Sequence, residues 1–311
     1  MAPPTIGLAL GSGMARGWAH IGVLRVIEEA GIKPDVIVGT SIGAVVGGAY
    51  LAGRLDAVEQ WARELTTFGV LRHMDVNLSG GGLVGGARLH SLLRRTLEGA
   101  CFEDLPASFA CVATDLLSGH EVWLREGGLA RAMRASFSMP GIFKPVRIGG
   151  QWLVDGALVN PVPVSVCHAL GAQIVIAVNV NGDLLGKKYS RRPGTATDQL
   201  AQALEDSAPK DSSRIHSMLQ QVFGATNNEP STFSVMSASL DIILDRITRS
   251  RLAGDPPDIS IVPHLGHIAL MDFQRGAEII DEGRAAAESV IGELGDIVGT
   301  FTTGAAPPPQ A

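Results

Sequence analysis

The seven residues at positions 37–43 read I-V-G-T-S-I-G and place one serine, Ser41, between Gly39 and Gly43. An apolar run precedes this Gly-x-Ser-x-Gly motif, and a helix of small and apolar residues is predicted directly after it, at 42–52. A strand that turns straight into a helix at a serine is the pattern of a nucleophile elbow, in which the turn exposes the hydroxyl group. Glycine and serine are also ordinary turn residues, so the motif alone leaves both interpretations open.

The segment before this motif has the same strand-turn-helix pattern. Residues 5–10 are a short apolar strand, residues 11–17 are a glycine-rich turn, and residues 18–30 carry apolar side chains at helical spacing. A second apolar strand at 34–38 then leads into the Ser41 turn. Two such units in succession indicate a parallel sheet that is covered by helices.

The rest of the chain extends this α/β pattern. Periodicity predicts further strands at 109–113, 121–124, 152–154, 173–180 and 259–262, and helices at 129–138, 164–170 and 271–294. An additional amphipathic stripe runs over residues 236–247. Residues 1–304 are therefore expected to form a single domain, followed by a disordered tail at 305–311.

A polar stretch at 183–232 interrupts this pattern and is expected to be an insertion outside the core. It contains the cluster K-K-Y-S-R-R at 187–192 and an amphipathic helix at 215–223. One hypothesis is that this stretch is a lid or a membrane-docking arm near Ser41, because a basic cluster beside an apolar face suits an anionic membrane. The alternative is a solvated loop followed by a helix that packs on the protein's own surface.

Composition and charge exclude several classes of protein. Hydrophobic residues make up 46% of the 311 residues and charged residues 18%, which favours a large packed core. The net charge of −6 argues against a nucleic-acid partner. Three cysteines without regular spacing argue against a disulfide framework, and the chain has no metal-binding sequence motif. Because the N-terminus lacks a basic region and a long apolar run, we expect a cytoplasmic protein.

The glycine-rich turn G-S-G-M-A-R-G at 11–17 can be interpreted in two ways. Gly11 and Gly13 fit the start of a dinucleotide-binding G-x-G-x-x-G motif, but Arg16 occupies the third glycine position. The next strand also ends without a carboxylate that could hold a ribose. The turn is better suited to an oxyanion hole, in which backbone N–H groups at a helix N-terminus stabilise negative charge.

Asp155, in the stretch L-V-D-G-A-L-V-N-P at 153–161, is the candidate partner of Ser41. An Asp-Gly pair is a common turn, and taken alone the turn is the simpler interpretation. A nucleophilic serine needs a group that accepts its proton, however, and the other two motifs make that role plausible for Asp155. Asp115 is expected to be a turn or cap residue, and residues 139–143 are expected to line the pocket, with ordinary core packing as the simpler alternative.

The order of glycine-rich turn, G-x-S-x-G and D-G-A resembles the patatin-like phospholipase family, especially its bacterial cytoplasmic members. The similarity also includes G-W-A-H-I-G-V-L at 17–24 and R-A-S-F-S-M-P-G-I-F at 134–143. It covers most of residues 5–182 and, more weakly, 258–292. The resemblance implies a three-layer α/β/α sandwich with a mainly parallel sheet, and a Ser–Asp dyad without a catalytic histidine.

The resemblance also implies roles for individual residues. Ser41 would be the nucleophile and Asp155 the base, in a hydrolase of phospholipids, lysophospholipids or other fatty-acyl esters that uses no metal or other cofactor. Peripheral contact with a membrane fits such a substrate. The glycine-rich turn would supply the oxyanion hole through the backbone of Ser12, Gly13 and Met14, with Gly11 opening the turn and Arg16 bracing it. Many relatives have glycine at the positions of Ser12 and Met14.

Two alternatives stay open at the level of the sequence. A conventional hydrolase has the chain order Ser, Asp, His, so a triad that uses His264 or His267 is a rival to the dyad. His20 could also be a third catalytic member, although packing of the helix at 18–30 is the simpler role. The second alternative is a lipid-binding or regulatory module with little turnover.

Overall fold

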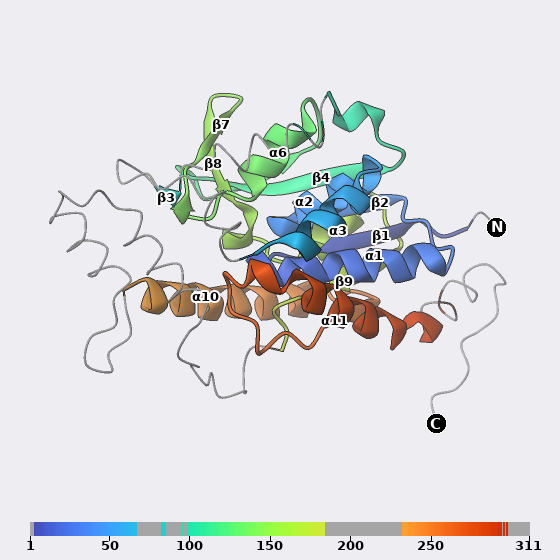
Figure 1. Ribbon diagram of the computed structural model, residues 1–311. Helices are drawn as coiled ribbons and strands as arrows, with labels where there is room; N and C mark the ends of the chain where they lie inside the picture. Colours follow the sequence, from blue (N-terminus) through green and yellow to red (C-terminus); the bar gives the residue numbers. More distant parts are fainter. Residues whose placement is uncertain are drawn as a thin grey trace, which may run out of the picture.

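The computed structural model describes residues 3–66, 82–84, 95, 97, 99–183, 232–293, 295 and 297. An eight-stranded sheet forms its middle layer, with the strand order β10-β9-β1-β2-β4-β8-β7 and with β5 also paired to β4 (Figure 1). Its strands are β1 (Ile6–Leu10), β2 (Val36–Thr40), β4 (Ser108–Asp115), β5 (Glu121–Leu124), β7 (Val146–Ile148), β8 (Gln151–Asp155), β9 (Ile174–Val178) and β10 (Ile259–Ile261). The pairings from β10 to β4 are parallel, whereas β5, β7 and β8 pair antiparallel. Two short strands, β3 (Gly82–Val84) and β6 (Gly141–Phe143), pair separately.

Helices cover both faces of the sheet. The α-helices are α1 (Ala19–Glu29), α2 (Ile42–Leu51), α3 (Leu55–Glu64), α6 (Leu129–Ser136), α7 (Val164–Ala169), α10 (Thr232–Gly254) and α11 (Gly276–Glu288). Short 3-10 turns lie at η1 (Met14–Trp18), η2 (Phe102–Asp104), η3 (Gly156–Leu158) and η4 (Phe273–Arg275). The fold is thus an α/β sandwich with helices on both sides of the sheet, which confirms the predicted fold class.

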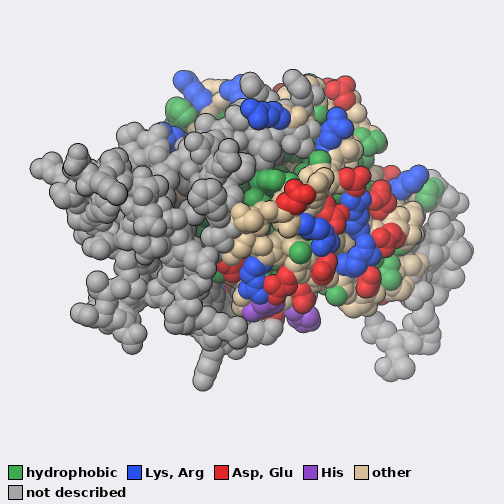
Figure 2. Space-filling view, in the orientation of Figure 1, with side chains coloured by type: hydrophobic (Ala, Val, Ile, Leu, Met, Phe, Trp, Pro, Cys, Tyr) green, Lys and Arg blue, Asp and Glu red, His purple; other side chains and the backbone are tan. Residues whose placement is uncertain are grey.

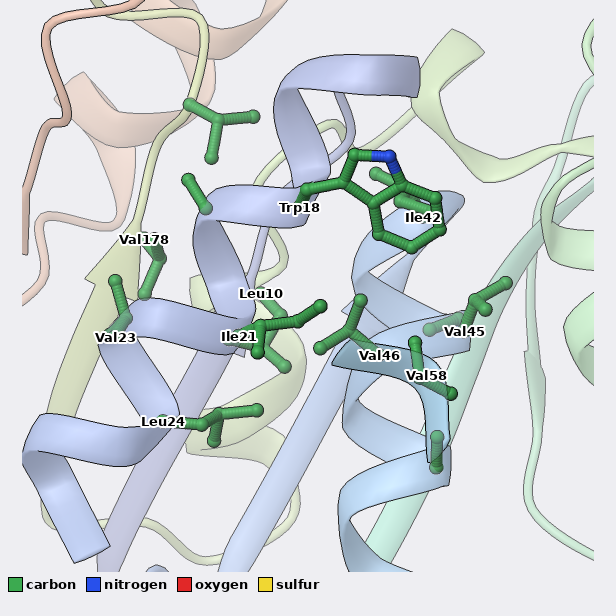
Figure 3. Packing of buried hydrophobic residues seen from close by; sticks show 14 of the residues in the cluster. Leu10, Trp18, Ile21, Val23, Leu24, Ile42, Val45, Val46, Val58 and Val178 are labelled. Carbon is green, nitrogen blue, oxygen red and sulfur yellow. The ribbon is translucent and has the colours of Figure 1, made fainter. Parts of the chain in front are cut away.

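Alternation along the strands divides the core between the two faces. In β1, Leu8 and Leu10 join the larger hydrophobic cluster beneath α1, α2, α3 and α11, whereas Ala9 joins the smaller cluster beneath α7. Trp18 and Ile42 both belong to the larger cluster, which ties η1 to the first turn of α2 (Figure 3). All five β1 side chains are buried, as expected for a central parallel strand.

The register around β4 explains how distant segments meet. Along one edge of β4, Thr40 at the end of β2 pairs with Val112, and Asp155 at the end of β8 pairs with Ala113. The opposite edge is occupied by β5, so β2 and β8 follow one another on the same edge. Because β2 runs parallel to β4 and β8 runs antiparallel, their carboxyl ends meet at two adjacent residues of β4, Val112 and Ala113.

Several elements differ from the sequence-based expectation. The helix expected at 18–30 is preceded by the turn η1. The segment 271–294, which the periodicity predicts as one or two helices, contains η4 and α11. The stripe at 236–247 belongs to the longer helix α10. The helix α3 was not predicted, and neither were the three-residue strands β6 and β7. These short strands lack the length over which a period of two residues can be recognised. Apart from Asp183 and Thr232, the stretch 183–232 lies outside the described residues, as does the tail 305–311.

Candidate active site

Ser41 occupies a strained turn between β2 and α2. Its φ of 59° and ψ of −122° lie outside the regions that L-residues ordinarily adopt. A Cβ atom on Gly39 would lie 2.4 Å from the backbone of Ala44, and one on Gly43 would lie 2.2 Å from the Leu10 carbonyl oxygen. The turn therefore needs glycine at both flanking positions, and it packs directly against the end of β1.

The hydroxyl of Ser41 is in contact with the carboxyl group of Asp155. Ser41 Oγ donates a hydrogen bond of 2.6 Å to Asp155 Oδ2, and both residues are fully buried. Asp155 Oδ1 accepts a second hydrogen bond of 2.8 Å from the backbone N–H of Ala157. Two of the predicted site residues, separated by 114 positions in the chain, are thus brought together with the carboxyl group fixed from both sides.

Burial changes the acid–base character of this carboxyl group. Desolvation raises the pKa of Asp155 from 3.8 to about 7, while the hydrogen bonds from Ser41 and Ala157 act in the opposite direction. Since the ideal pKa of a general base lies near the working pH, Asp155 is far better matched to accept a proton than an exposed aspartate.

Ser136, at the end of α6, holds the backbone of the Ser41 turn. Its hydroxyl accepts a hydrogen bond of 2.9 Å from Ser41 N and donates one of 2.5 Å to the Val112 carbonyl. Sequence reasoning did not identify this residue individually, although it lies in the R-A-S-F-S-M-P-G-I-F stretch of the family resemblance. The contact links the turn to β4 and α6, so three elements determine where the Ser41 hydroxyl lies.

The N–H groups of the glycine-rich turn are not equivalent. Gly11 N donates to the Val178 carbonyl at 3.0 Å, and Ser12 N donates to the Pro161 carbonyl at 2.8 Å. Within the described part of the chain, no acceptor is recorded for the N–H groups of Gly13 and Met14. Met14 has a φ of 50°, so the turn adopts the strained backbone there without a glycine. Of the three N–H groups expected to form the oxyanion hole, that of Ser12 is thus occupied by a protein carbonyl, and those of Gly13 and Met14 have no acceptor among the described residues.

Arg16 braces this turn from a fully buried position. Its Nε donates to the Ile268 carbonyl at 2.9 Å, and its guanidinium pairs with Asp241 of α10 at 3.1 Å. It also donates to Asn181 Oδ1 at 3.2 Å, and Asn181 Nδ2 donates to the Ser12 carbonyl at 2.8 Å. Arg16 thus contacts the turn partly through Asn181, for which the sequence contained no signal.

The three candidate histidines lie in different environments. His20 Nε2 donates to the Gly11 carbonyl at 2.7 Å, and burial lowers the pKa of His20 to about 4, so the ring is neutral. His264 is largely exposed and lies 3.8 Å from Asp183, and His267 is paired with Glu278 at 2.8 Å. None of the hydrogen bonds recorded for Ser41 or Asp155 in the described residues involves a histidine.

Other predicted features have structural rather than chemical roles. Asp115 accepts hydrogen bonds from the N–H groups of Leu117 and Ser118, as expected of a turn residue. Met139 and Phe143 are buried within the main hydrophobic cluster, so this segment packs in the core.

Among the described residues, no group of three or more His, Cys, Asp or Glu side chains is placed to hold a metal ion. Over the same part of the chain, no helix is both long and apolar enough to span a bilayer.

Comparison with known sequences gives a consistent result. A family model described as patatin-like phospholipase matches residues 8–168. An uncharacterized NTE family protein of Mycobacterium tuberculosis is 32% identical over 329 aligned positions, which cover 93% of this chain and 91% of that protein. Patatin-like phospholipase domain-containing protein 6 of Homo sapiens is 33% identical over 184 positions, which cover 57% of this chain and 13% of that much longer protein.

Among solved structures, VipD from Legionella pneumophila aligns with a TM-score of 0.48 and 11% sequence identity. The alignment covers 94% of this chain and 67% of that one.

Proposed function

The chain belongs to the patatin-like phospholipase family, and on that premise we propose that it hydrolyses lipid acyl esters with Ser41 as nucleophile and Asp155 as general base. The observation that carries the proposal is the hydrogen bond of 2.6 Å between Ser41 Oγ and Asp155 Oδ2 at a strained turn. A buried hydroxyl with a proton acceptor of raised pKa is the arrangement that nucleophilic catalysis requires.

The proposed reaction has two halves. Ser41 Oγ attacks the ester carbonyl carbon while its proton passes to Asp155 Oδ2, which gives a tetrahedral oxyanion. Collapse of this intermediate breaks the bond to the leaving alcohol, which takes the proton from Asp155 and leaves an acyl-enzyme. A water molecule then attacks the acyl group as Asp155 accepts its proton. The second collapse releases the fatty acid and returns the proton to Ser41.

We assign stabilisation of the oxyanion to the N–H groups of Gly13 and Met14. This narrows the set expected from the sequence, because the N–H groups of Gly11 and Ser12 already donate to protein carbonyls. The remaining two groups lie in the turn that packs against the Ser41 elbow, as the close approach of Gly43 to the Leu10 carbonyl indicates. Loss of one such donor typically costs about 3–4 kcal/mol of transition-state stabilisation.

The dyad is favoured over a Ser-His-Asp triad by the contacts of the histidines. Among the described residues, no histidine forms a hydrogen bond with Asp155. Its two carboxyl oxygens accept from Ser41 Oγ and Ala157 N instead. A lipid-binding module with little turnover is the remaining alternative. Such a module would not require the Ser41–Asp155 contact or the strained elbow, so both features favour catalysis.

Covalent labelling tests the assignment of Ser41. We expect a fluorophosphonate probe to label the wild type at this residue, and p-nitrophenyl esters of graded chain length to be hydrolysed. Ser41→Ala should lose both properties, whereas the matched change Ser289→Ala, at an exposed serine after α11, should lose neither. Label that persists on another serine in the Ser41→Ala variant would overturn the assignment. Ester binding without turnover in the wild type would favour the lipid-binding module.

The proposal includes peripheral contact with an anionic bilayer, supported by an exposed apolar surface. Leu116 and Leu117, at the tip of the β4–β5 turn, are 50% and 85% exposed, and Trp152 of β8 is 44% exposed. The N–H of Leu116 donates to the Trp152 carbonyl at 2.8 Å, so these two residues lie side by side on adjacent segments. The Arg147 guanidinium lies 5.9 Å from the Trp152 ring centre. Tryptophan, leucine and arginine together suit a lipid interface.

Position and charge connect this surface to the site. Leu116 lies three residues beyond Ala113, the residue level with Asp155, and therefore about 10 Å further along β4. Residues 127–154 carry four basic and no acidic side chains in a chain of net charge −6. Lys and Arg side chains gather over the region of α6 and β7 at the top of Figure 2. An anionic surface would be attracted to this end of the sheet.

Vesicle binding tests the membrane contact. The double variant Leu117→Ser with Arg147→Glu should bind phosphatidylglycerol vesicles at least tenfold more weakly at low salt, while hydrolysis of a short soluble ester is unchanged. Ile242→Ser removes another exposed apolar side chain, on α10, and serves as the control. Charge reversal of Lys187, Lys188, Arg191 and Arg192 tests the docking arm expected from the sequence. Vesicle binding that depends only on those four residues would contradict a contact through β4 and β8.

A further inference from the structure

The first three carbonyl groups of the glycine-rich turn each accept a hydrogen bond. Asn181 Nδ2 donates to the Ser12 carbonyl at 2.8 Å, and Arg16 N donates to the Gly13 carbonyl at 3.1 Å. The Gly11 carbonyl is held by His20 at 2.7 Å. One of these three donors, Asn181, is a side chain from the loop after β9, 169 positions away in the chain.

Peptide geometry transmits this contact to the other side of the turn. The Ser12 carbonyl and the Gly13 N–H belong to one planar trans peptide unit, so they point in opposite directions. A donor that holds the Ser12 oxygen on one side therefore directs the Gly13 N–H to the other side. That N–H is one of the two for which no acceptor is recorded in the described part of the chain.

The amide of Asn181 is itself held in one orientation. Its Oδ1 accepts from the buried Arg16 guanidinium at 3.2 Å, which leaves Nδ2 as the group that faces the Ser12 oxygen. The backbone N–H of Asn181 donates to Asn179 Oδ1 at 3.1 Å, which fixes the loop that carries it. Arg16 is anchored in turn by Asp241 and the Ile268 carbonyl. The side chain of Asn181 is thus a rigid link between Arg16 and the turn.

We propose that Asn181 is a positioning residue that aims the Gly13 N–H at the oxyanion. The proposal rests on the function proposed above, since it assigns a cause to the direction of one oxyanion donor. It accounts for the amide at this position. A carboxylate of the same shape would still accept from Arg16, but it would present an oxygen to the Ser12 oxygen. Repulsion between the two oxygens would turn the Ser12–Gly13 peptide and remove the Gly13 N–H from the site.

The isosteric change Asn181→Asp tests the proposal, with Asn179→Asp as the matched control. The control places the same charge two residues away and keeps the one side-chain bond of Asn179, because an aspartate still accepts from Asn181 N. For Asn181→Asp we expect kcat on a soluble p-nitrophenyl ester to fall about 10²- to 10³-fold, with KM within threefold of the control. The kcat of Asn181→Ala should lie between those of Asn181→Asp and the control Asn179→Asp.

A transition-state analogue separates positioning from general damage. A trifluoromethyl ketone with a fatty-acyl chain adds to Ser41 and places an oxyanion in the hole, so its inhibition constant should rise in parallel with the loss of kcat across the variants. Binding of the corresponding fatty acid should not change. If Asn181→Asp also binds the fatty acid more weakly and melts at a lower temperature than the control, the loss of kcat is a folding effect and the proposal is overturned.

A crystal structure of Asn181→Asp gives a readout that does not depend on turnover. We expect the Ser12–Gly13 peptide to be rotated relative to the wild type and unrotated in Asn179→Asp. An unrotated peptide, or a kcat within threefold of the control, would overturn the role of Asn181. A rotated peptide in a protein whose wild type neither labels at Ser41 nor hydrolyses esters would support the link through Asn181 and overturn the proposed function instead.

Discussion

The turns after β1 and β2 adopt similarly strained backbones but are held in different ways. Met14 and Ser41 are the two non-glycine residues with positive φ among the described residues, at 50° and 59°. The Ser41 turn is enforced by close backbone packing, because side chains at Gly39 and Gly43 would collide with backbone atoms of Ala44 and Leu10, and Ser136 adds a hydrogen bond to Ser41 N. The Met14 turn is held by Arg16, which is anchored to distant residues, and by Asn181, which donates to the Ser12 carbonyl. The turn that presents a side chain is thus fixed chiefly by backbone atoms packed against it, whereas the turn that presents N–H groups is fixed chiefly by hydrogen bonds from side chains.

Removal of the charge at Asp155, the partner of the Ser41 turn, should cause the largest loss of kcat. Asp155→Asn keeps the shape of the side chain but cannot accept the Ser41 proton, so we expect kcat to fall about 10³- to 10⁴-fold in a folded protein. Asp115→Asn is the matched control, because Asp115 ends the paired strand β4 and, among the described residues, its carboxyl group accepts hydrogen bonds from its own turn and from Gln151. Steady-state kinetics on a soluble ester decide the point, and comparable losses in both variants would refute the dyad.

Alanine at the glycines should distinguish the two turns. At Gly43 the added Cβ would meet the Leu10 carbonyl oxygen at 2.2 Å, so Gly43→Ala should lower the free energy of unfolding by about 3 kcal/mol or more. At Gly13 it would meet the side chain of Val180 at 2.3 Å, which can shift more easily. Gly13→Ala should remain folded and lose about 10²-fold in kcat through displacement of an oxyanion donor.

Denaturant unfolding and kinetics on both variants provide the measurements. If Gly13→Ala unfolds as readily as Gly43→Ala, the turn after β1 is held as rigidly by local packing as the elbow is. The contrast between the two turns would then be wrong.

The pH dependence should report the buried carboxyl group. Since the pKa of Asp155 is raised to about 7, kcat/KM should fall about tenfold for each pH unit below that value, as the proton acceptor is lost. Burial favours the protonated form in the folded protein. The contribution of Asp155 to the free energy of unfolding should therefore decrease as pH rises from about 4 to 7. His20, whose pKa is lowered by burial to about 4, contributes the opposite slope in both proteins, so the decrease is measured as the difference between the wild type and Asp155→Asn. A pH–rate profile whose acid limb lies near pH 4 would contradict the assignment.

The histidine variants should have the smallest effects. His264→Ala and His267→Ala should each retain kcat within about twofold, because both side chains are at the surface and pair with acidic residues. His20→Ala should lose about tenfold, since it frees the Gly11 carbonyl, and His20→Gln should restore most of the loss by supplying an N–H donor. A loss of kcat of a thousandfold in a folded histidine variant would favour the triad.

Much of the fold and part of the site were predictable because they depend on short stretches. The pairs of strand and helix at 5–30 and 34–52 follow from periodicity, and the elbow follows from Gly-x-Ser-x-Gly. Asp155 was predicted from its motif and from the need for a proton acceptor. Its contact with Ser41 and its raised pKa are properties of the folded chain, in which desolvation outweighs two hydrogen bonds.

The sequence by itself determined the α/β class, the place of the elbow and the types of residue that could form the site. Only the tertiary structure decided which N–H groups of the glycine-rich turn are free and that Asn181 and Ser136 hold the two turns. It also decided that β2 and β8 meet end to end along β4. The physical reason is range: helical and strand periods act over a few residues, whereas these contacts join positions 95 to 169 residues apart. Such contacts depend on the register of strands and on packing, which no local pattern encodes.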